Sequence, residues 1–296
     1  MVNSSVSENL TLPEPLHVGI HPTAIVDPRA ALHPSVTVGP YSVIHRDCTI
    51  GENTVINAHV VIEPYTQLGK NCVVSSGAVL GGLPQDLKFE NKPSYVVVGD
   101  ETIIREFATI HRSSKAGGQT TVGKKCMLMA YSHIAHDCTI GDEVIIANSA
   151  QLAGHVTLSD GVFLGGATCV HQGVTIGRYA ILGGVSATRQ DVPPFAIADG
   201  RPAHIAGVNR IALKRRGFSP ESRNRIKQAF QLIWFSNLNY KESVEKVEQT
   251  LPQDENITEL LAFVKNSKRG IHRPPNGKTS KQVIADSLLD RSDNKL

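Results

Sequence analysis

The chain contains few aromatic residues and has only a weak excess of positive charge. Of its 296 residues, 5% are Phe, Trp or Tyr, and the formal net charge is +3. Nucleic-acid binding usually requires a concentrated basic patch, so we expect no nucleic-acid partner. The sequence also lacks an apolar run long enough to cross a bilayer, so we expect no integral membrane segment.

Cysteine pairs and a secretion signal are also missing. The five cysteines form no CxxC motif, and their spacing does not indicate a disulfide framework. Residues 1–16 lack the basic start and apolar centre of a signal peptide, so we interpret them as a flexible leader. Buried free thiols and no secretion signal favour a cytoplasmic protein.

The dominant feature is an aliphatic residue at every sixth position. A helix needs apolar spacing of about 3.6 residues and a half-buried strand needs about 2, so this period fits neither alone. It is typical of a hexapeptide β-helix, in which each repeat forms a short strand and a corner, with the aliphatic side chain inside the prism. The positions are Ile20, Val26, Leu32, Val38, Ile44, Ile50, Ile56, Ile62, Leu68, Val74, Leu80, Val98, Ile104, Ile110, Val122, Leu128, Ile134, Ile140, Ile146, Leu152, Leu158, Leu164, Val170, Ile176 and Leu182.

Glycine follows many of these residues, as at Ile50-Gly51, and we expect it to permit a tight corner. The repeat predicts a β-helix over 17–190, with loop excursions at 82–97 and 112–121. Both excursions return to the same phase, so they should project from an unbroken prism. Loops on a rigid scaffold often carry binding residues.

After residue 190 the pattern changes. Segment 191–271 begins with prolines that disfavour regular strands, and it then becomes helical. Ser219 followed by Pro220 is a typical helix start. We expect amphipathic helices at 219–235, 241–251 and 257–264, and a polar, disordered tail at 272–296.

If three hexapeptides form one coil, residues eighteen apart stack in adjacent coils, about 4.8 Å apart. Polar residues that are distant in sequence then converge on one edge of the prism. One column would contain His136, Gly154 and Gln172, and the next would contain Asp137 and His155, with His171 beside them.

His133 and His136 are candidates for acid–base chemistry. An imidazole takes a proton from a hydroxyl, and an adjacent carboxylate such as Asp137 fixes its tautomer. A single surface histidine usually has no such role, but four on one predicted edge, with His155 and His171, favour function. The same cluster fits a catalytic zinc site of three imidazoles and water, which stays open as the less favoured alternative.

Other polar positions suit binding. The amide of Gly154, beside the predicted base, suits an oxyanion hole for acyl transfer, although a glycine required only by the corner would look the same. Arg215 and Arg216, in the basic triplet Lys214-Arg215-Arg216, can bind a diphosphate. Most basic triplets, however, are only solvated surface. Asp86 and Lys88, on the first excursion, suit sugar hydroxyls and a phosphate.

These residues lie in an ordered set of motifs covering roughly residues 17–271. The set resembles the acyl-[acyl-carrier-protein]:UDP-N-acetylglucosamine O-acyltransferase family, which performs the first step of lipid A biosynthesis. The motifs are Pro84-Gln-Asp-Leu-Lys88, Thr109-Ile-His-Arg112, His133-Ile-Ala-His-Asp-Cys138, Leu152-Ala-Gly-His155, Val170-His-Gln172, Gln190-Asp-Val-Pro-Pro194, Leu213-Lys-Arg-Arg-Gly-Phe218 and Lys268-Arg-Gly-Ile271.

The resemblance implies a mainly β fold: a left-handed parallel β-helix of hexapeptide repeats followed by a C-terminal α-helical domain. It also implies a homotrimer with sites between subunits. The implied reaction transfers an (R)-3-hydroxyacyl group from acyl carrier protein to the 3-hydroxyl of UDP-N-acetylglucosamine, with no metal and no cofactor beyond the donor's phosphopantetheine thioester.

Roles follow from the resemblance for individual residues. The catalytic base maps to His136, with Asp137 beside it and Gly154 as the oxyanion amide. A small acyl-chain ruler at Gly184 would leave room for a long chain. UDP-sugar binding maps to Asp86, Lys88, His133, Gln172, Asn209, Arg215 and Arg216, and His155 and His171 match further site histidines.

One departure concerns the nucleotide. The family often has an acidic residue two places after the Asn, whereas here Asn209 is followed by Arg210 and Ile211. Four alternatives stay open: N-acylation of a UDP-3-amino sugar, an acyl-CoA-dependent hexapeptide enzyme, a zinc hydratase, and a catalytically silent scaffold.

Overall fold

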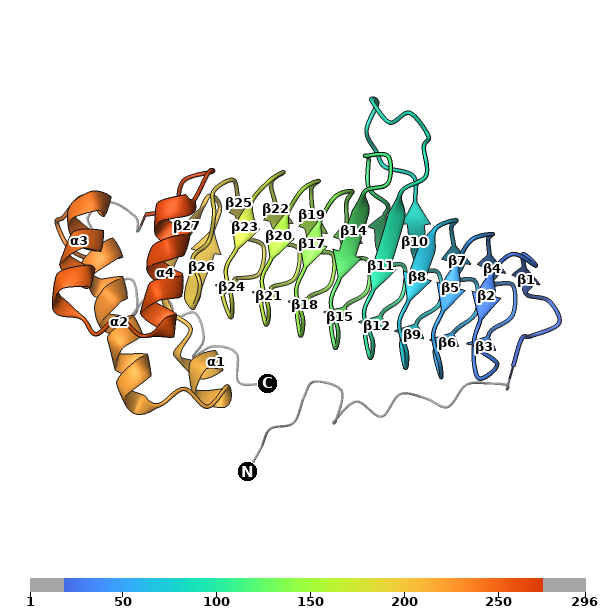
Figure 1. The fold of residues 1–296 in the computed structure, drawn as a ribbon, viewed down its shortest axis with the longest axis horizontal. Helices are drawn as coiled ribbons and strands as arrows, with labels where there is room; N and C mark the ends of the chain where they lie inside the picture. The colour runs from blue at the N-terminus through green and yellow to red at the C-terminus, as the bar shows by residue number, and fades with distance from the viewer. Residues whose placement is uncertain (1–18, 274–296) are drawn as a thin grey trace.

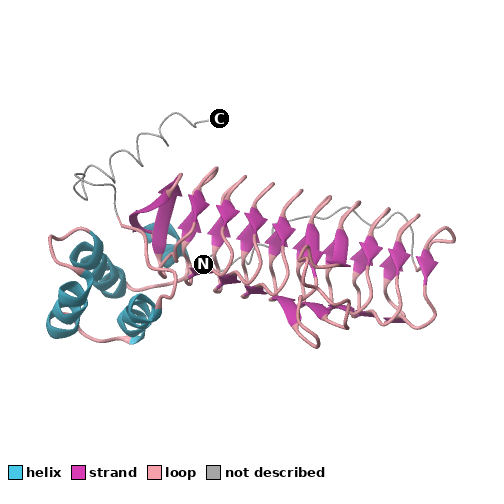
Figure 2. Ribbon diagram, turned by 90° about the horizontal axis from the view of Figure 1, so that it is seen from above, coloured by secondary structure: helices cyan, strands magenta, loops and turns pink. Residues whose placement is uncertain are grey.

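The computed structural model describes residues 19–273, so the leader 1–16 and residues 274–296 of the expected tail lie outside the described residues. Short parallel strands wind around a triangular prism with helices packed at one end (Figures 1 and 2). The predicted left-handed parallel β-helix with a C-terminal helical region is confirmed. No helix in the described part of the chain has the length and apolarity needed to cross a bilayer.

Three sheets form the faces of the prism, and from β1 to β25 every third strand belongs to the same sheet. Sheet 1 contains β1 (Ile25–Val26), β4 (Val43–Ile44), β7 (Val61–Ile62), β10 (Val79–Gly82), β13 (Thr109–His111), β16 (His133–Ile134), β19 (Gln151–Leu152), β22 (Cys169–Val170) and β25 (Ala187–Thr188). Sheet 2 contains β2 (Ala31–Leu32), β5 (Thr49–Ile50), β8 (Thr66–Leu68), β11 (Tyr95–Val98), β14 (Gln119–Val122), β17 (Thr139–Ile140), β20 (Thr157–Leu158) and β23 (Thr175–Ile176). Sheet 3 contains β3 (Thr37–Val38), β6 (Val55–Ile56), β9 (Val73–Val74), β12 (Ile103–Ile104), β15 (Met127–Leu128), β18 (Ile145–Ile146), β21 (Phe163–Leu164), β24 (Ile181–Leu182), β26 (Ala196–Gly200) and β27 (Ala203–Val208).

The predicted eighteen-residue stacking is confirmed by the strand register. Ile134 pairs with Leu152, and Leu152 pairs with Val170, each pair in successive coils. All three are at most 2% exposed, so the repeat produces a continuous aliphatic core. The first coil is the exception: among residues 19–273 it has a neighbouring coil on one side only, and Ile20 is 52% exposed.

The glycines that follow the aliphatic residues have a different role from the one predicted. Gly51 does not adopt a positive φ; instead, an added Cβ would lie 2.5 Å from the Gly69 carbonyl oxygen of the next coil. The left-handed corner residue comes two places later, as at Asn53 with φ 55°. Glycine is therefore required by close backbone stacking between coils, and the corner itself accepts larger residues.

Both excursions leave the prism between sheet 1 and sheet 2, and the first is the long projection between β10 and β11 in Figure 1. They occupy 83–94 and 112–118, shorter than predicted at the C-terminal side. The reason is that β11 and β14 extend to four residues each and pair from Tyr95 with Gln119 onward.

The C-terminal region is less helical than predicted at its start. Strand β26 continues sheet 3 by pairing in parallel with β24, and β27 then pairs antiparallel with β26. Residues 191–208 therefore close the prism, with Pro193 and Pro194 in the turn before β26 and Pro202 in the turn between β26 and β27. Helices follow at α1 (Arg210–Arg215), α2 (Pro220–Trp234), α3 (Tyr240–Thr250) and α4 (Glu255–Asn266).

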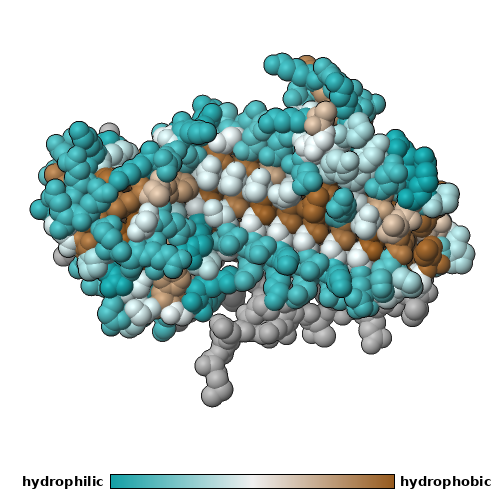
Figure 3. Space-filling view, in the orientation of Figure 1, coloured by the Kyte–Doolittle hydropathy of each residue, from teal (hydrophilic) through white to brown (hydrophobic). Residues whose placement is uncertain are grey.

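Three of these helices were predicted, and α1 was not. Ser219 accepts a hydrogen bond from Ser222 N as the N-cap of α2, as its sequence indicated. His272, which we assigned to the disordered tail, is 5% exposed and shares a 2.7 Å hydrogen bond between Nε2 and Thr188 Oγ1. A band of apolar and weakly polar side chains runs along the prism face shown in Figure 3.

Candidate active site

The histidine cluster lies on the corner between sheet 1 and sheet 2, which we call corner 1–2. His136 follows β16, His155 follows β19 and His171 follows β22, so successive coils present them in a row. Both loop excursions emerge from this same corner, next to the cluster. The predicted convergence of these histidines on one edge is therefore confirmed.

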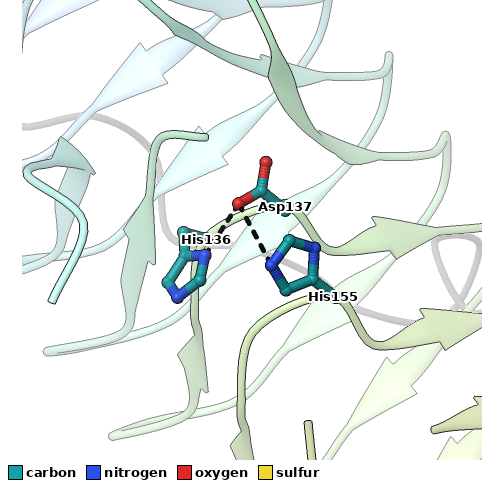
Figure 4. Close-up of side chains that lie close together, drawn as sticks. All are labelled: His136, Asp137 and His155. Atoms are coloured by element: carbon teal, nitrogen blue, oxygen red, sulfur yellow. Dashed lines mark hydrogen bonds and ion pairs between the residues drawn. The ribbon is translucent and has the colours of Figure 1, made fainter. Parts of the chain in front are cut away.

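His136 and Asp137 form a hydrogen-bonded dyad (Figure 4). The distance from His136 Nδ1 to Asp137 Oδ2 is 2.7 Å, and the two side chains are 11% and 8% exposed. A carboxylate is only an acceptor, so Nδ1 carries the proton of this hydrogen bond and Nε2 keeps its lone pair. The arrangement therefore presents Nε2 as a base.

The Asp137 carboxylate is surrounded by donors from the second excursion. Ser113 Oγ donates to Oδ1, while Ser114 donates to Oδ2 from its hydroxyl at 2.7 Å and its amide at 3.1 Å. Burial raises the pKa of Asp137, but the hydrogen bonds from Ser113, Ser114 and His136 lower it by more. The carboxylate is therefore held well into its ionised form.

Gly154 packs directly against the imidazole of His136, as the column arrangement predicted. A Cβ at this position would lie 2.5 Å from His136 Cε1 and 2.7 Å from Nε2. The neighbouring amide of His155 donates to the His136 carbonyl at 3.0 Å, which fixes the two coils against each other. Among residues 19–273 the Gly154 N–H has no hydrogen-bond partner, so it remains available to an oxyanion.

His155 completes a cluster of three potential metal ligands. Its Nε2 is 3.7 Å from Asp137 Oδ2, and its ring lies edge-on to that of His136 at 5.2 Å between centroids. However, Asp137 Oδ2 already accepts hydrogen bonds from three donors, and His136 presents a protonated Nδ1 to it. These contacts favour a base dyad over the zinc alternative.

His133 packs against His111, which was not predicted as a site residue. His133 Nδ1 hydrogen-bonds Thr109 Oγ1 at 2.7 Å, and His111 packs edge-on against its ring at 4.9 Å. Burial, followed by the charges of His133 and His136, lowers the pKa of His111 to about 4, and its buried Nδ1 has no hydrogen-bond partner in the described part of the chain. The motif containing His111 was visible, but the second excursion breaks the eighteen-residue spacing that would have placed it here.

His171 and Gln172 are exposed, two coils beyond His136 along corner 1–2. His171 Nδ1 is 2.9 Å from Nη2 of Arg269, which arrives from the segment after α4. Arg269 lies in one of the quoted motifs but was not predicted as a site residue.

Asp86 and Lys88 lie on the first excursion above corner 1–2. Asp86 Oδ1 accepts a 2.9 Å hydrogen bond from the Lys88 amide, which closes a local turn and leaves the lysine side chain exposed. The structure thus places both residues on the same corner as the dyad, and among residues 19–273 neither forms a hydrogen bond with His136 or Asp137.

The predicted nucleotide residues lie elsewhere on the same chain. Asn209 is 3% exposed and caps α1, accepting from Ala212 N at 3.1 Å and donating to the Tyr179 carbonyl at 2.8 Å. Arg216 forms an ion pair with Glu143, between sheets 2 and 3, and its guanidinium lies 5.1 Å from the Tyr179 ring centroid. Arg215, the last residue of α1, is exposed.

Gly184 lies on the third corner, between sheets 3 and 1. It is exposed, and within the described residues an added Cβ would meet the Gly166 carbonyl oxygen at 3.5 Å and the Gly166 amide nitrogen at 3.9 Å, both ordinary contacts. A single chain therefore brings together the residues of corner 1–2 but leaves Arg215, Arg216 and Gly184 on the other corners.

Comparisons with known proteins agree with these features. Residues 191–272 match the family described as Udp N-acetylglucosamine O-acyltransferase, Domain 2, and residues 47–82 and 119–154 match the bacterial transferase hexapeptide family. The chain is 46% identical over 255 residues to the acyl-[acyl-carrier-protein]–UDP-N-acetylglucosamine O-acyltransferase of Thermodesulfovibrio yellowstonii, covering 86% of this chain and 99% of the relative. It is 49% identical over 270 residues to the enzyme of the same name from a Sulfurihydrogenibium species, covering 91% and 99%.

Solved structures give the same result. The UDP-N-acetylglucosamine acyltransferase of Francisella novicida is 35% identical, with a TM-score of 0.84 over 87% of this chain and 95% of that one. The protein of the same name from Campylobacter jejuni is 37% identical, with a TM-score of 0.82 over 87% and 100% of the two chains.

Proposed function

The chain belongs to the acyl-[acyl-carrier-protein]–UDP-N-acetylglucosamine O-acyltransferase family, and from that membership we propose its reaction and its mechanism. It transfers an (R)-3-hydroxyacyl group from acyl carrier protein to the 3-hydroxyl of UDP-N-acetylglucosamine, the first step of lipid A biosynthesis. The observation that carries the mechanism is the His136–Asp137 dyad packed against the free amide of Gly154.

His136 acts as the general base. Its Nε2 removes the proton from the sugar 3-hydroxyl as the oxygen attacks the thioester carbonyl, and Asp137 stabilises the resulting imidazolium. The Gly154 amide donates to the tetrahedral oxyanion. When the intermediate collapses, the C–S bond breaks and the departing pantetheine thiolate takes the proton from His136.

The transfer is direct, without an acyl-enzyme. Cys138, next to the dyad, is fully buried and its Sγ is 3.3 Å from the Ala153 carbonyl. Burial raises the pKa of this thiol to about 12, so it stays protonated and unreactive. A thioester is already an activated acyl donor, so the proposed reaction needs neither a metal nor a bound cofactor.

The complete site is formed between subunits of a homotrimer. The dyad lies on corner 1–2, while Arg216 and Gly184 lie on the other two corners of the same chain. In a trimer with parallel prisms, corner 1–2 of one subunit faces a different corner of its neighbour. Arg215 and Arg216 of one subunit would then bind the diphosphate of a sugar held by the other, beside Asp86 and Lys88.

The remaining assignments complete the proposal. His133, His155, His171 and Gln172 contact the UDP-sugar along corner 1–2. Asn209 acts indirectly, since it is buried as the cap of α1. Gly184 leaves space for a long acyl chain, and the reaction takes place in the cytoplasm, where acyl carrier protein supplies the thioester.

The experiment is mass spectrometry of products formed from UDP-N-acetylglucosamine and a chain-length panel of (R)-3-hydroxyacyl carrier proteins. A base-labile UDP-3-O-acyl sugar that is lost with His136→Ala supports the reaction and the base. A base-stable product from the UDP-3-amino sugar alone would replace O-acylation by N-acylation. A preference for acyl chains of about ten carbons or fewer would contradict the role of Gly184. Glycine has no side chain to shorten the groove, so a long chain should fit.

A further inference from the structure

The catalytic carboxylate accepts more hydrogen bonds from the second excursion than from the catalytic histidine. Of its four donors, one is His136 Nδ1, and the other three are the Ser113 hydroxyl, the Ser114 hydroxyl and the Ser114 amide. Both oxygens are engaged, so the carboxylate cannot rotate without losing at least one of these bonds. Its orientation toward the imidazole therefore depends on two residues outside the dyad, Ser113 and Ser114.

Ser113 is itself held so that its hydroxyl has one direction to donate. The residue is fully buried, and its Oγ accepts a hydrogen bond from the Lys115 amide at 3.0 Å. Its carbonyl accepts from the Ser94 hydroxyl at 2.6 Å, at the base of the first excursion. Because the Ser113 Oγ already accepts from Lys115, its proton is free to be donated to Asp137.

We propose that Ser113 and Ser114 are positioning residues for the acyl transfer, which fix the Asp137 carboxylate against His136 and limit how strongly it stabilises the imidazolium. The proposal rests on the proposed function, in which the dyad is the base. Hydrogen bonds donated to a carboxylate stabilise its charge, so they also reduce the charge available to the imidazole.

The other titratable groups around the dyad have fixed places. His155 Nε2 is 3.7 Å from the carboxylate, and His133 and His111 pack on the preceding coil. Burial lowers the pKa of both His133 and His111, and burial raises that of Cys138. Near neutral pH, His133, His111 and Cys138 therefore stay uncharged. The serine hydroxyls are the hydrogen-bond donors to the carboxylate that substitution can remove without changing a charge.

The direction of the effect on pH dependence follows. Without the two hydroxyls the carboxylate loses donors and becomes more basic, so it stabilises the imidazolium more strongly. The base would then stay protonated to higher pH, and the acid limb of kcat/KM against pH would move upward. A purely structural role for the serines would lower activity without this displacement.

The test compares Ser113→Ala, Ser114→Ala and the double variant with a matched control, Ser132→Ala. Ser132 is also buried, at 2% exposure, and its hydroxyl has no hydrogen-bond partner among residues 19–273, so its loss removes the same group without touching the carboxylate. We expect kcat of the double variant to fall roughly tenfold or more, with KM for UDP-N-acetylglucosamine within about twofold. The acid limb should move up by about half a pH unit. Ser114→Thr, which keeps the hydroxyl, should have the kcat and the acid limb of the wild type. The control Ser132→Ala should also match the wild type in both.

Two outcomes would overturn the proposal. One is a folded double variant with wild-type kcat and pH profile, and the other is a loss in the double variant that Ser132→Ala reproduces. Thermal unfolding of each variant identifies protein that is not folded, and in that case the single variant Ser114→Ala decides by the same pH profile. His136→Ala is included throughout: if it retains activity, the proposed base is wrong, whereas an inactive His136→Ala beside an unchanged serine variant defeats only the present inference.

Discussion

Replacing Gly154 with Ala tests the contact on which the mechanism depends most. Gly154 does not have a positive φ, so its backbone conformation accepts alanine. The new Cβ would lie 2.5 Å from His136 Cε1 and 2.7 Å from Nε2, inside any real contact distance. Relieving this overlap moves the imidazole by about 1 Å, and a displacement of that size at a reacting group costs on the order of a hundredfold in rate. We expect kcat to fall by about that factor, measured from initial rates of UDP-3-O-acyl product.

Gly39→Ala is the matched control for the Gly154 substitution. Its Cβ would lie 2.6 Å from the Asn57 carbonyl carbon, an overlap of similar size but with backbone atoms. Gly39 lies on the corner between sheets 3 and 1, several coils away from the His136–Asp137 dyad. Backbone cannot move aside as a side chain can, so this variant should lose roughly 1–3 kcal/mol of stability and keep kcat within about threefold. Wild-type kcat in a folded Gly154→Ala protein would refute the reasoning, and so would an equal loss of kcat in Gly39→Ala.

Three further predictions concern the carboxylate, the thiol and a buried histidine. Asp137→Asn keeps the side-chain size but removes the charge that stabilises the imidazolium, so kcat should fall by about a hundredfold or more in steady-state assays; a smaller effect would reduce Asp137 to a minor role. Cys138→Ala should keep kcat within about threefold, and intact-protein mass spectrometry of the wild type should find no acyl adduct, whose presence would contradict direct transfer. Burial lowers the pKa of His272 to about 4, so the unfolded chain binds more protons than the folded one below its ordinary pKa, and the free energy of unfolding should fall as the pH drops from about 6.5 to about 4. Urea titrations of His272→Gln should show a smaller fall; an unchanged pH dependence would assign the effect to other groups.

The repeat predicted the fold because a six-residue period, closed three to a coil, leaves few other arrangements. It also predicted that Gly154 lies on His136, since an eighteen-residue spacing becomes a direct contact in the strand register. Spatial neighbours were harder to predict wherever an insertion interrupts the eighteen-residue spacing. His111 and the two serines beside Asp137 belong to or adjoin the second excursion, and no fixed spacing connects them to the dyad.

The reason for the repeat glycines was also wrong, and for a physical cause. Sequence alone does not separate a glycine required by left-handed φ from one required by close stacking, and Gly51 is of the second kind. The C-terminal hairpin of β26 and β27 was not predicted, because prolines disfavour regular strands; in the structure they lie in the turns before and between the two strands.

Asp137 and His155 occupy the left-handed corner position of their coils, with φ 61° and 60°. Asp, Asn and His tolerate this conformation better than most residues, and Val185 is the single β-branched residue that adopts it among residues 19–273. The backbone and the chemistry therefore select overlapping residue types at the same place. A mutation that introduces a carboxylate or an imidazole at such a corner therefore lowers the stability of the β-helix only slightly. An evolving β-helix can acquire catalytic groups one coil at a time without first gaining stability elsewhere.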